Sequence, residues 1–209
     1  MPLYLTENIK NIGTFALWQL TESEEELLSL RPLSEQEDNE FSFLKNSKRR
    51  KEWLTIRILL QHLTGGNFLL NYLPNGKPLL QEPKLFLSIS HSENFVAVFI
   101  SKNKEVGIDV EKFRKNINLL KNKFLCPEEL SQIDVSDEML LHIYWGAKEA
   151  MYKMYSFYHP LFTEHLSVQY VDYQKYTAIG KIEKENLKKT VKILFRRIEN
   201  NILVCVFEA

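Results

Sequence analysis

The 209-residue sequence predicts an α+β fold built from two lobes, because strands and helices follow one another in both halves of the chain. Apolar runs of strand length alternate with stretches of helical periodicity, and no internal repeat or low-complexity linker interrupts them. A chain of this length can bury a core either as one large domain or as two halves of about a hundred residues. We place the two lobes at 1–104 and 105–209.

The N-terminal half is expected to contain one long helix and several short strands. Its strongest pattern is an apolar stripe over 48–63 that Gly65 and Gly66 end. An earlier helix should begin at Thr21 or Ser23, where glutamates suit a helix N-terminus. The predicted strands lie at 3–5, 14–19, 85–90 and 95–101, the last two as a hairpin.

The C-terminal half is expected to open with a strand, continue with helices and return to β structure. The opening strand is 106–110, and the tail is rich in alternating apolar residues. Pro127 fits the first turn of a helix. The predicted helices span 116–125, 128–134 and 137–156, and the predicted later strands lie near 166–173, 190–197 and 202–208.

The composition is that of an ordinary globular protein, with 44% hydrophobic and 26% charged residues. Lys plus Arg and Asp plus Glu both number 27, which argues against bulk attraction to nucleic acid or to a membrane surface. No apolar run has the roughly 18 to 20 residues that a membrane span needs, and the N-terminus lacks a signal-peptide layout. We therefore expect a cytoplasmic protein. Cys126 and Cys205 have no metal spacing and are interpreted as small packed side chains.

Two acidic segments suggest a metal site. The first is G-I-D-V-E (107–111), where Asp109 and Glu111 point to the same side of a strand. The second is W-G-A-K-E-A-M-Y-K (145–153), where Glu149 and Lys153 share a helix face. Three carboxylates and a lysine could hold Mg²⁺ against a phosphate. Taken singly, the same residues could be a solvated strand end and an ordinary surface ion pair.

Lys148 lies about 100° around the helix from Glu149 and is given no catalytic role. We expect Lys148→Ala to impair the chemistry far less than Lys153→Ala.

The two acidic segments resemble the signature segments of the 4′-phosphopantetheinyl transferases, in particular the surfactin-synthetase-activating type. Two further segments are similar to that family, namely N-G-K-P (75–78) and S-I-S-H-S (88–92). The resemblance implies two similar lobes related by a pseudo-twofold axis, with the active site in the cleft between them. It implies Mg²⁺-dependent transfer of phosphopantetheine from coenzyme A to a serine of an acyl or peptidyl carrier protein.

The resemblance also implies roles for the acidic residues. Asp109, Glu111 and Glu149 correspond to ligands of Mg²⁺ bound to the coenzyme A diphosphate, and Lys153 corresponds to a contact with a phosphate oxygen. Glu129 matches a position proposed as the base that deprotonates the serine. A negative charge in the first turn of a helix is an equally good interpretation of Glu129.

The remaining candidates would contact coenzyme A: Arg50, Arg57, Lys77, Ser90 and His91. Arg57 matches a family arginine, and Arg50 lies within about 20° of it around the helix. A solvated helix face is the alternative for Arg50. Lys77 sits in a glycine-containing turn, whereas Ser90 and His91 end a hairpin strand, where turn chemistry is the alternative.

The rival interpretation is a non-catalytic protein that binds coenzyme A or a carrier protein. We favour the enzyme, a holo-[acyl-carrier-protein] synthase, because all the expected metal carboxylates are present. We expect a monomer, since two lobes in one chain supply a complete cleft. The segment 154–162 has no glycine where many family members have one. The resemblance therefore does not define the shape of the pocket wall near the pantetheine arm or the choice of carrier.

Overall fold

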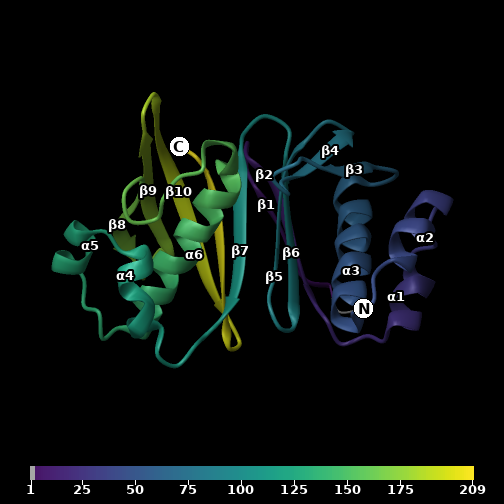
Figure 1. The fold of residues 1–209 in the computed structure, drawn as a ribbon, viewed down its shortest axis with the longest axis horizontal. Helices are drawn as coiled ribbons and strands as arrows, with labels where there is room; N and C mark the ends of the chain where they lie inside the picture. Colours follow the sequence, from purple (N-terminus) through teal and green to yellow (C-terminus); the bar gives the residue numbers. More distant parts are fainter. Residues whose placement is uncertain (1–2) are drawn as a thin grey trace.

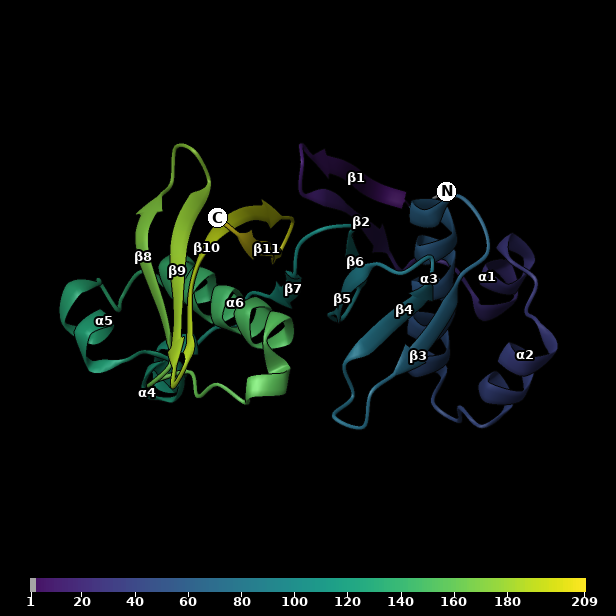
Figure 2. The same ribbon diagram turned by 90° about the horizontal axis from the view of Figure 1, so that it is seen from above.

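Two β-sheets pack face to face between two groups of helices in this computed structural model, which describes residues 3–209 (Figures 1 and 2). The first sheet has the strand order β1-β2-β6-β5, and the second has the order β7-β11-β10-β9-β8. The N-terminal strands are β1 (Leu3–Ile9), β2 (Gly13–Gln19), β3 (Leu69–Tyr72), β4 (Pro78–Glu82), β5 (Phe86–His91) and β6 (Phe95–Ser101). The C-terminal strands are β7 (Val106–Lys112), β8 (Leu166–Asp172), β9 (Thr177–Lys184), β10 (Leu187–Ile198) and β11 (Asn201–Glu208).

The helices lie on the outer sides of the two sheets, as Figure 1 shows. Those of the N-terminal half are α1 (Glu24–Leu30), α2 (Glu35–Ser42) and α3 (Ser47–Thr64). Those of the C-terminal half are η1 (Ile117–Leu120), α4 (Lys121–Phe124), α5 (Pro127–Gln132), α6 (Glu138–Met154) and η2 (Ser156–Tyr158). No helix within residues 3–209 is both long and apolar enough to cross a membrane.

Local signals in the sequence set the helix ends. Ser23 and Ser34 begin α1 and α2 through capping boxes, in which each serine side chain and a glutamate three residues later satisfy free backbone N–H groups. Gly65 ends α3 with a φ of 75°, a left-handed conformation that glycine adopts without steric cost.

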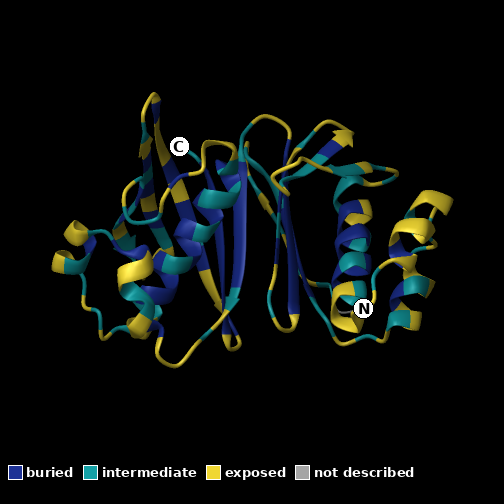
Figure 3. Ribbon diagram, in the orientation of Figure 1, coloured by how far each residue is buried: buried dark blue, intermediate teal, exposed yellow. Residues whose placement is uncertain are grey.

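The central strands are buried on both faces because each sheet lies between its partner sheet and its own helices (Figure 3). Strand β11 shows this clearly. Leu203, Cys205 and Phe207 pack between the two sheets, whereas Val204 and Val206 pack under the helices of the second sheet. Such strands form continuous apolar runs instead of alternating patterns.

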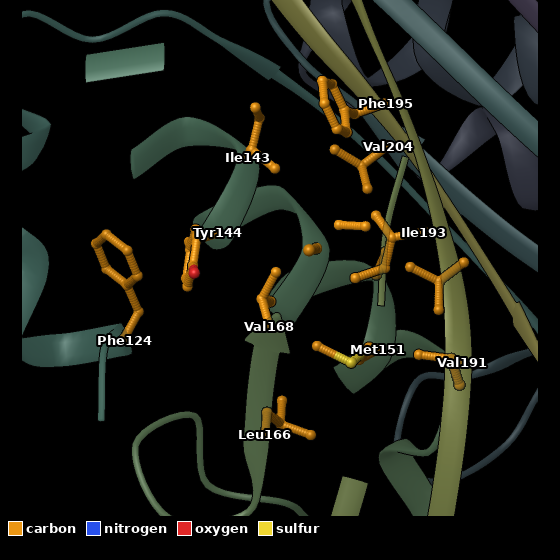
Figure 4. Close-up of a cluster of buried hydrophobic side chains, with 14 of the residues drawn as sticks. Phe124, Ile143, Tyr144, Met151, Leu166, Val168, Val191, Ile193, Phe195 and Val204 are labelled. Carbon is orange, nitrogen blue, oxygen red and sulfur yellow. The ribbon is translucent and has the colours of Figure 1, made fainter. Parts of the chain in front are cut away.

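Helix α6 is the main cover of the second sheet. Ile143, Ala147 and Met151 are fully buried on it and pack against Val168, Ile193 and Val204 of the sheet (Figure 4). Burying an aliphatic side chain of this size contributes roughly 1.5–3 kcal/mol. The position of α6 on the second sheet is therefore firmly fixed.

The predicted α+β class agrees with this structure. The pseudo-twofold relation and the lobes 1–104 and 105–209 remain predictions, although the first sheet ends at Ser101 and the second begins at Val106. The helix predicted over 116–125 is present as two consecutive short pieces, η1 and α4. The sequence interpretation also missed α2, β3, β4 and β9; in α2 only Phe41 is buried, which leaves no periodic pattern to detect.

Candidate functional site

The two glycines of the acidic segments let α6 approach β7 closely. A Cβ on Gly107 would lie 2.1 Å from the carbonyl oxygen of Ala150, and a Cβ on Gly146 would lie 2.9 Å from Cγ2 of Val204. Any larger residue at Gly107 would push the helix away from the strand. Because the strand and the helix touch here, Asp109 of β7 faces α6.

Asp109 is the buried centre of the site, with 2% of its surface exposed. Its Oδ1 accepts hydrogen bonds from Lys153 Nζ at 2.7 Å and from Ser90 Oγ at 3.0 Å. Its Oδ2 is also buried and has no hydrogen-bond partner among residues 3–209. An unpaired oxygen on a buried carboxylate is costly, so this oxygen points to a missing donor or cation.

Glu149 and Glu111 lie close enough to Asp109 for their charges to interact. Burial, followed by the charge of Asp109, raises the pKa of Glu149 to about 7. The same two causes raise the pKa of Glu111, although Arg114 Nη2 donates to this carboxylate at 3.0 Å. The mutual repulsion of the three carboxylates is a form of strain that a cation would relieve.

These carboxylates do not yet enclose a cation. Within residues 3–209, no three acidic, histidine or cysteine side chains are arranged so that they could hold a metal ion. Lys153 occupies one oxygen of Asp109, and Arg114 occupies Glu111. The structure therefore brings the predicted ligands together without the convergence on one point that we expected.

His91 lies in a second cluster at the end of β5. Its Nε2 is 2.9 Å from Arg49 Nη1, and its Nδ1 is 3.2 Å from Oε1 of the buried Glu52. Arginine can only donate, so Nε2 accepts and the imidazole is neutral. This agrees with a lowered pKa of His91, which burial causes despite the opposing effect of Glu52.

Two small cavities adjoin these clusters and share Gly76, Pro78 and Ile89 as a common wall. One, of about 200 Å³, is lined by Arg49 and His91. The other, of about 220 Å³, is lined by Lys77 and Lys153. Because they share this wall, we call the two cavities together the groove. Its charged lining residues are Arg49, Lys77, Lys153 and one carboxylate, Glu52, and this surplus of cations suits an anionic ligand.

Lys77 is placed beside the groove by its turn. Gly76 has a φ of 81°, in the left-handed region. The Lys77 ammonium donates to the carbonyl oxygen of Met154 at 2.9 Å and to Glu105 at 3.1 Å. It therefore satisfies a free carbonyl at the end of α6 while it lines the groove.

Arg50 and Arg57 do not lie in this groove. Arg50 makes a two-pronged ion pair with Glu24 at 2.6 and 2.7 Å. Arg57 is 3% exposed, stacks on Trp53 and pairs with Glu40 at 3.1 Å; burial is the main cause that lowers its pKa to about 10. Both guanidinium groups hold α1 and α2 against α3, although Arg57 Nε has no hydrogen-bond partner among residues 3–209. Since neither arginine lines the groove, the structure gives no support to their expected contact with coenzyme A.

Glu129 also lies outside the acidic cluster. Its Oε2 accepts from Lys148 Nζ at 2.6 Å and from the backbone N–H of Cys126, and its Oε1 accepts from the backbone N–H of Val168 at 2.8 Å. Both oxygens are used and the side chain is buried. The geometry therefore favours the structural interpretation of Glu129 over its role as a base.

Ser90 joins the acidic cluster but not as an available phosphate ligand. Its hydroxyl donates to Asp109 and accepts from Lys153 Nζ at 2.7 Å and from the backbone N–H of Val110 at 3.2 Å. A hydroxyl has one donor and two acceptor sites, so its capacity is full.

The sequence interpretation missed Arg49 and Glu52 as residues of the site, and it missed the buried ion pair of Lys148 with Glu129. The sequence did contain a signal for Arg49 and Glu52. Together with Ile56 they are spaced so that they lie on one face of α3, and this face lines the groove. Lys148 gave no such signal, since its partner Glu129 lies on a different helix. At the end of η2, His159 adopts a φ of 46°, so a left-handed residue does occur in the glycine-free segment.

Comparison with known proteins supports a family for the part of the chain that carries the acidic cluster. Residues 105–196 match the model of the 4′-phosphopantetheinyl transferase superfamily. This match includes the acidic segments of both β7 and α6. It does not include the groove residues of the N-terminal half.

Curated relatives point to the same superfamily. The chain is 33% identical over 112 residues to the 4′-phosphopantetheinyl transferase AcpT of Escherichia coli (strain K12), a match that covers 50% of this chain and 57% of the relative. It is 27% identical over 123 residues to the 4′-phosphopantetheinyl transferase HetI of Nostoc sp. (strain PCC 7120), which covers 51% and 52%. The chain thus matches little more than half the length of these relatives, and neither name specifies the surfactin-synthetase-activating type.

Proposed function

We propose that this protein transfers the 4′-phosphopantetheine group from coenzyme A to a serine of an apo acyl or peptidyl carrier protein, and releases adenosine 3′,5′-bisphosphate. The observation that carries the proposal is the unpartnered buried oxygen of Asp109 beside Glu149, in the region that matches the transferase superfamily. Phosphoryl transfer needs positive charge beside the phosphate. An acidic cluster with surplus negative charge can hold the cation that supplies it. We further propose the surfactin-synthetase-activating type, acting as a monomer in the cytoplasm.

The residues present fit Mg²⁺. It is a hard ion that prefers oxygen ligands, and it commonly takes one or two carboxylates while phosphates and water complete its shell. A preformed three-carboxylate cage is therefore unnecessary. Asp109 would supply its free Oδ2, and Glu149 and Glu111 would turn toward it. When bound, Mg²⁺ would neutralise charge on the diphosphate of coenzyme A.

The cationic groove would hold the rest of coenzyme A. Arg49 at one end and Lys77 and Lys153 at the other offer donors to its phosphate groups, and His91 lines the cavity beside Arg49. Lys153 lies beside Asp109 and would contact the phosphate that is attacked. These side chains bind and orient the substrate, which supplies much of the rate in phosphoryl transfer.

The chemical step needs a group that accepts a proton. The serine oxygen forms a bond to the phosphorus of phosphopantetheine, and the bond from that phosphorus to the bridging diphosphate oxygen breaks. Glu149 is the best placed acceptor, because it lies in the acidic cluster and makes no hydrogen bond or ion pair with any of residues 3–209, whereas Glu129 is fully engaged.

Intact mass spectrometry of a co-expressed apo carrier protein tests the proposal. The carrier mass should rise by one phosphopantetheine group with the wild-type protein, and a much smaller fraction of the carrier should be modified with Asp109→Asn over the same time. A protein that binds coenzyme A but never changes the carrier mass, across acyl and peptidyl carriers, would contradict the proposal and favour a non-catalytic binding protein.

A further inference from the structure

The two sheets meet along a pair of edge strands, β5 of the first sheet and β7 of the second. Each stands at the end of its sheet's strand order, and they lie side by side in Figures 1 and 2. The outward N–H groups of an edge strand have no backbone partner in their own sheet. In a buried strand such as β7, these groups must find another acceptor.

Two serine hydroxyls of β5 provide that acceptor. Ser88 Oγ accepts from the backbone N–H of Ile108 at 3.0 Å, and Ser90 Oγ accepts from the backbone N–H of Val110 at 3.2 Å. Both serines are almost completely buried, at 3% and 4% exposure. Their spacing of two residues matches the spacing of the two N–H groups, because both strands have a period of two. We call these four residues the serine seam.

Ser90 extends the seam into the acidic cluster. Besides the N–H of Val110, its hydroxyl contacts Asp109 Oδ1 and Lys153 Nζ. Lys153 also donates to the carbonyl oxygen of Ile108 at 3.2 Å, on the same edge of β7. Ser88 makes no contact of this kind with the acidic residues among residues 3–209.

We propose that the serine seam joins the two sheets and that Ser90 is a positioning residue, which fixes Asp109 and Lys153 in the arrangement needed for the cation and the phosphate. The effect on catalysis rests on the proposed function, whereas the seam itself does not. This assignment replaces the phosphate-binding role that the sequence suggested for Ser90, because its hydroxyl has no capacity left.

Three alanine variants test the proposal: Ser90→Ala, Ser88→Ala and Ser101→Ala. Ser101 is the matched control, since its hydroxyl is equally buried and donates to the carbonyl oxygen of Ile12, away from the acidic cluster. Amide hydrogen exchange by NMR reports on the seam, and Mn²⁺ binding without coenzyme A reports on the acidic cluster. Steady-state kinetics separate kcat from KM for coenzyme A.

We expect the amide of Val110 to exchange at least about tenfold faster in Ser90→Ala, and that of Ile108 likewise in Ser88→Ala. Affinity for Mn²⁺ should fall about 10- to 100-fold in Ser90→Ala only, as for other groups that orient a metal ligand. The kcat should fall in Ser90→Ala while KM for coenzyme A stays within about twofold. Ser101→Ala should change none of these quantities.

The opposite results are equally clear. A raised KM with unchanged kcat and Mn²⁺ affinity in Ser90→Ala would restore the phosphate-binding role and overturn our proposal. If the wild-type protein neither binds Mn²⁺ nor modifies a carrier, the proposed function fails. Amide hydrogen exchange would still test whether the serine seam joins the two sheets. Val110 and Ile108 amides that exchange freely in the wild-type protein would overturn the seam without any variant.

Discussion

Two lysines of α6 each form an ion pair with a carboxylate, but one lysine is fully buried and the other is partly exposed. Lys148 and Lys153 are five residues apart, and each binds a buried carboxylate. The Lys148 ammonium is completely buried and donates to Glu129, to the carbonyl oxygen of Phe124 at 2.7 Å and to that of Phe162 at 3.0 Å. All three of its donors are used.

The pair formed by Lys153 and Asp109 is open by contrast. The Lys153 ammonium also makes three hydrogen bonds, but its side chain is 29% exposed, so that a ligand can reach it. Asp109 keeps one oxygen without a partner among residues 3–209. Glu149 adds a second carboxylate whose pKa is raised to about 7 by burial and by Asp109. A closed pair stabilises a fold, whereas an open pair with surplus negative charge can accept a cation and a phosphate.

The largest effect should come from opening the closed pair. Lys148→Ala leaves Glu129 buried and without its cation, and such a loss typically costs about 3–5 kcal/mol. Lys153→Ala should cost clearly less, because water can reach the vacated position beside Asp109. Urea denaturation of the three proteins measures the difference, and an equal loss from both variants would break the comparison.

The sequence could not supply this contrast. The expectation that Lys148→Ala impairs the chemistry far less than Lys153→Ala stays a prediction, and the structure adds that loss of Lys148 should be the more severe change for stability. The helical spacing of Glu149 and Lys153 predicted their shared face, since i and i+4 contacts are local. The partner of Lys148 depends on how α5 packs against α6, which no local pattern encodes.

The same distinction explains which other site residues were predictable. Asp109 and Glu111 follow from the alternation of one strand. Arg57 was interpreted as a ligand contact because α3 places it beside Trp53. Its partner Glu40 lies on α2, a helix that the apolar pattern of the sequence did not predict. The α+β class was predictable because it depends on many local patterns, each of which contributes little.

The open pair should control the chemistry. Asp109→Asn keeps the size of the side chain but removes the charge that would bind Mg²⁺, so transfer should fall by about 10²-fold or more. Carrier modification at saturating Mg²⁺ measures this, with Glu93→Gln as an exposed control on the β5–β6 turn. Wild-type turnover in folded Asp109→Asn would remove the acidic cluster from the reaction.

A smaller effect should appear in the stability of the metal-free protein. Burial and the charge of Asp109 raise the pKa of Glu149 from its ordinary value of 4.5 to about 7 in the folded protein. The stability that its proton contributes is therefore complete below pH 4.5 and is lost as the pH rises to 7. The Glu149→Gln variant has no carboxyl group at this position, so it does not lose this stability as the pH rises. Above pH 7 the variant should therefore be more stable than the wild type by on the order of 1–2 kcal/mol.

Thermal unfolding with a chelator present, at pH 4.5 to 8.5, measures this difference. Relative to Glu149→Gln, the wild type should weaken between pH 4.5 and 7 and then level off. Adding Mg²⁺ at pH 8 should reduce the difference in stability between Glu149→Gln and the wild type, because the cation compensates the negative charge of the acidic cluster. A gap that does not depend on pH would mean that Glu149 is not strained by its neighbours.

The smallest effect should separate two adjacent arginines of α3 in the same way as the two lysines of α6. Arg50 is closed, because Glu24 and two backbone carbonyl oxygens occupy its donors, whereas Arg49 is 61% exposed at the groove beside His91. Arg49→Ala should raise KM for coenzyme A about tenfold with kcat unchanged, since a remote phosphate contact is made equally in the ground and transition states. Arg50→Ala should instead lower the unfolding midpoint and leave KM near its wild-type value. If Arg50→Ala raises KM as much as Arg49→Ala does, coenzyme A reaches past the groove to α1, and the rule that only open cations serve the substrate fails for this protein.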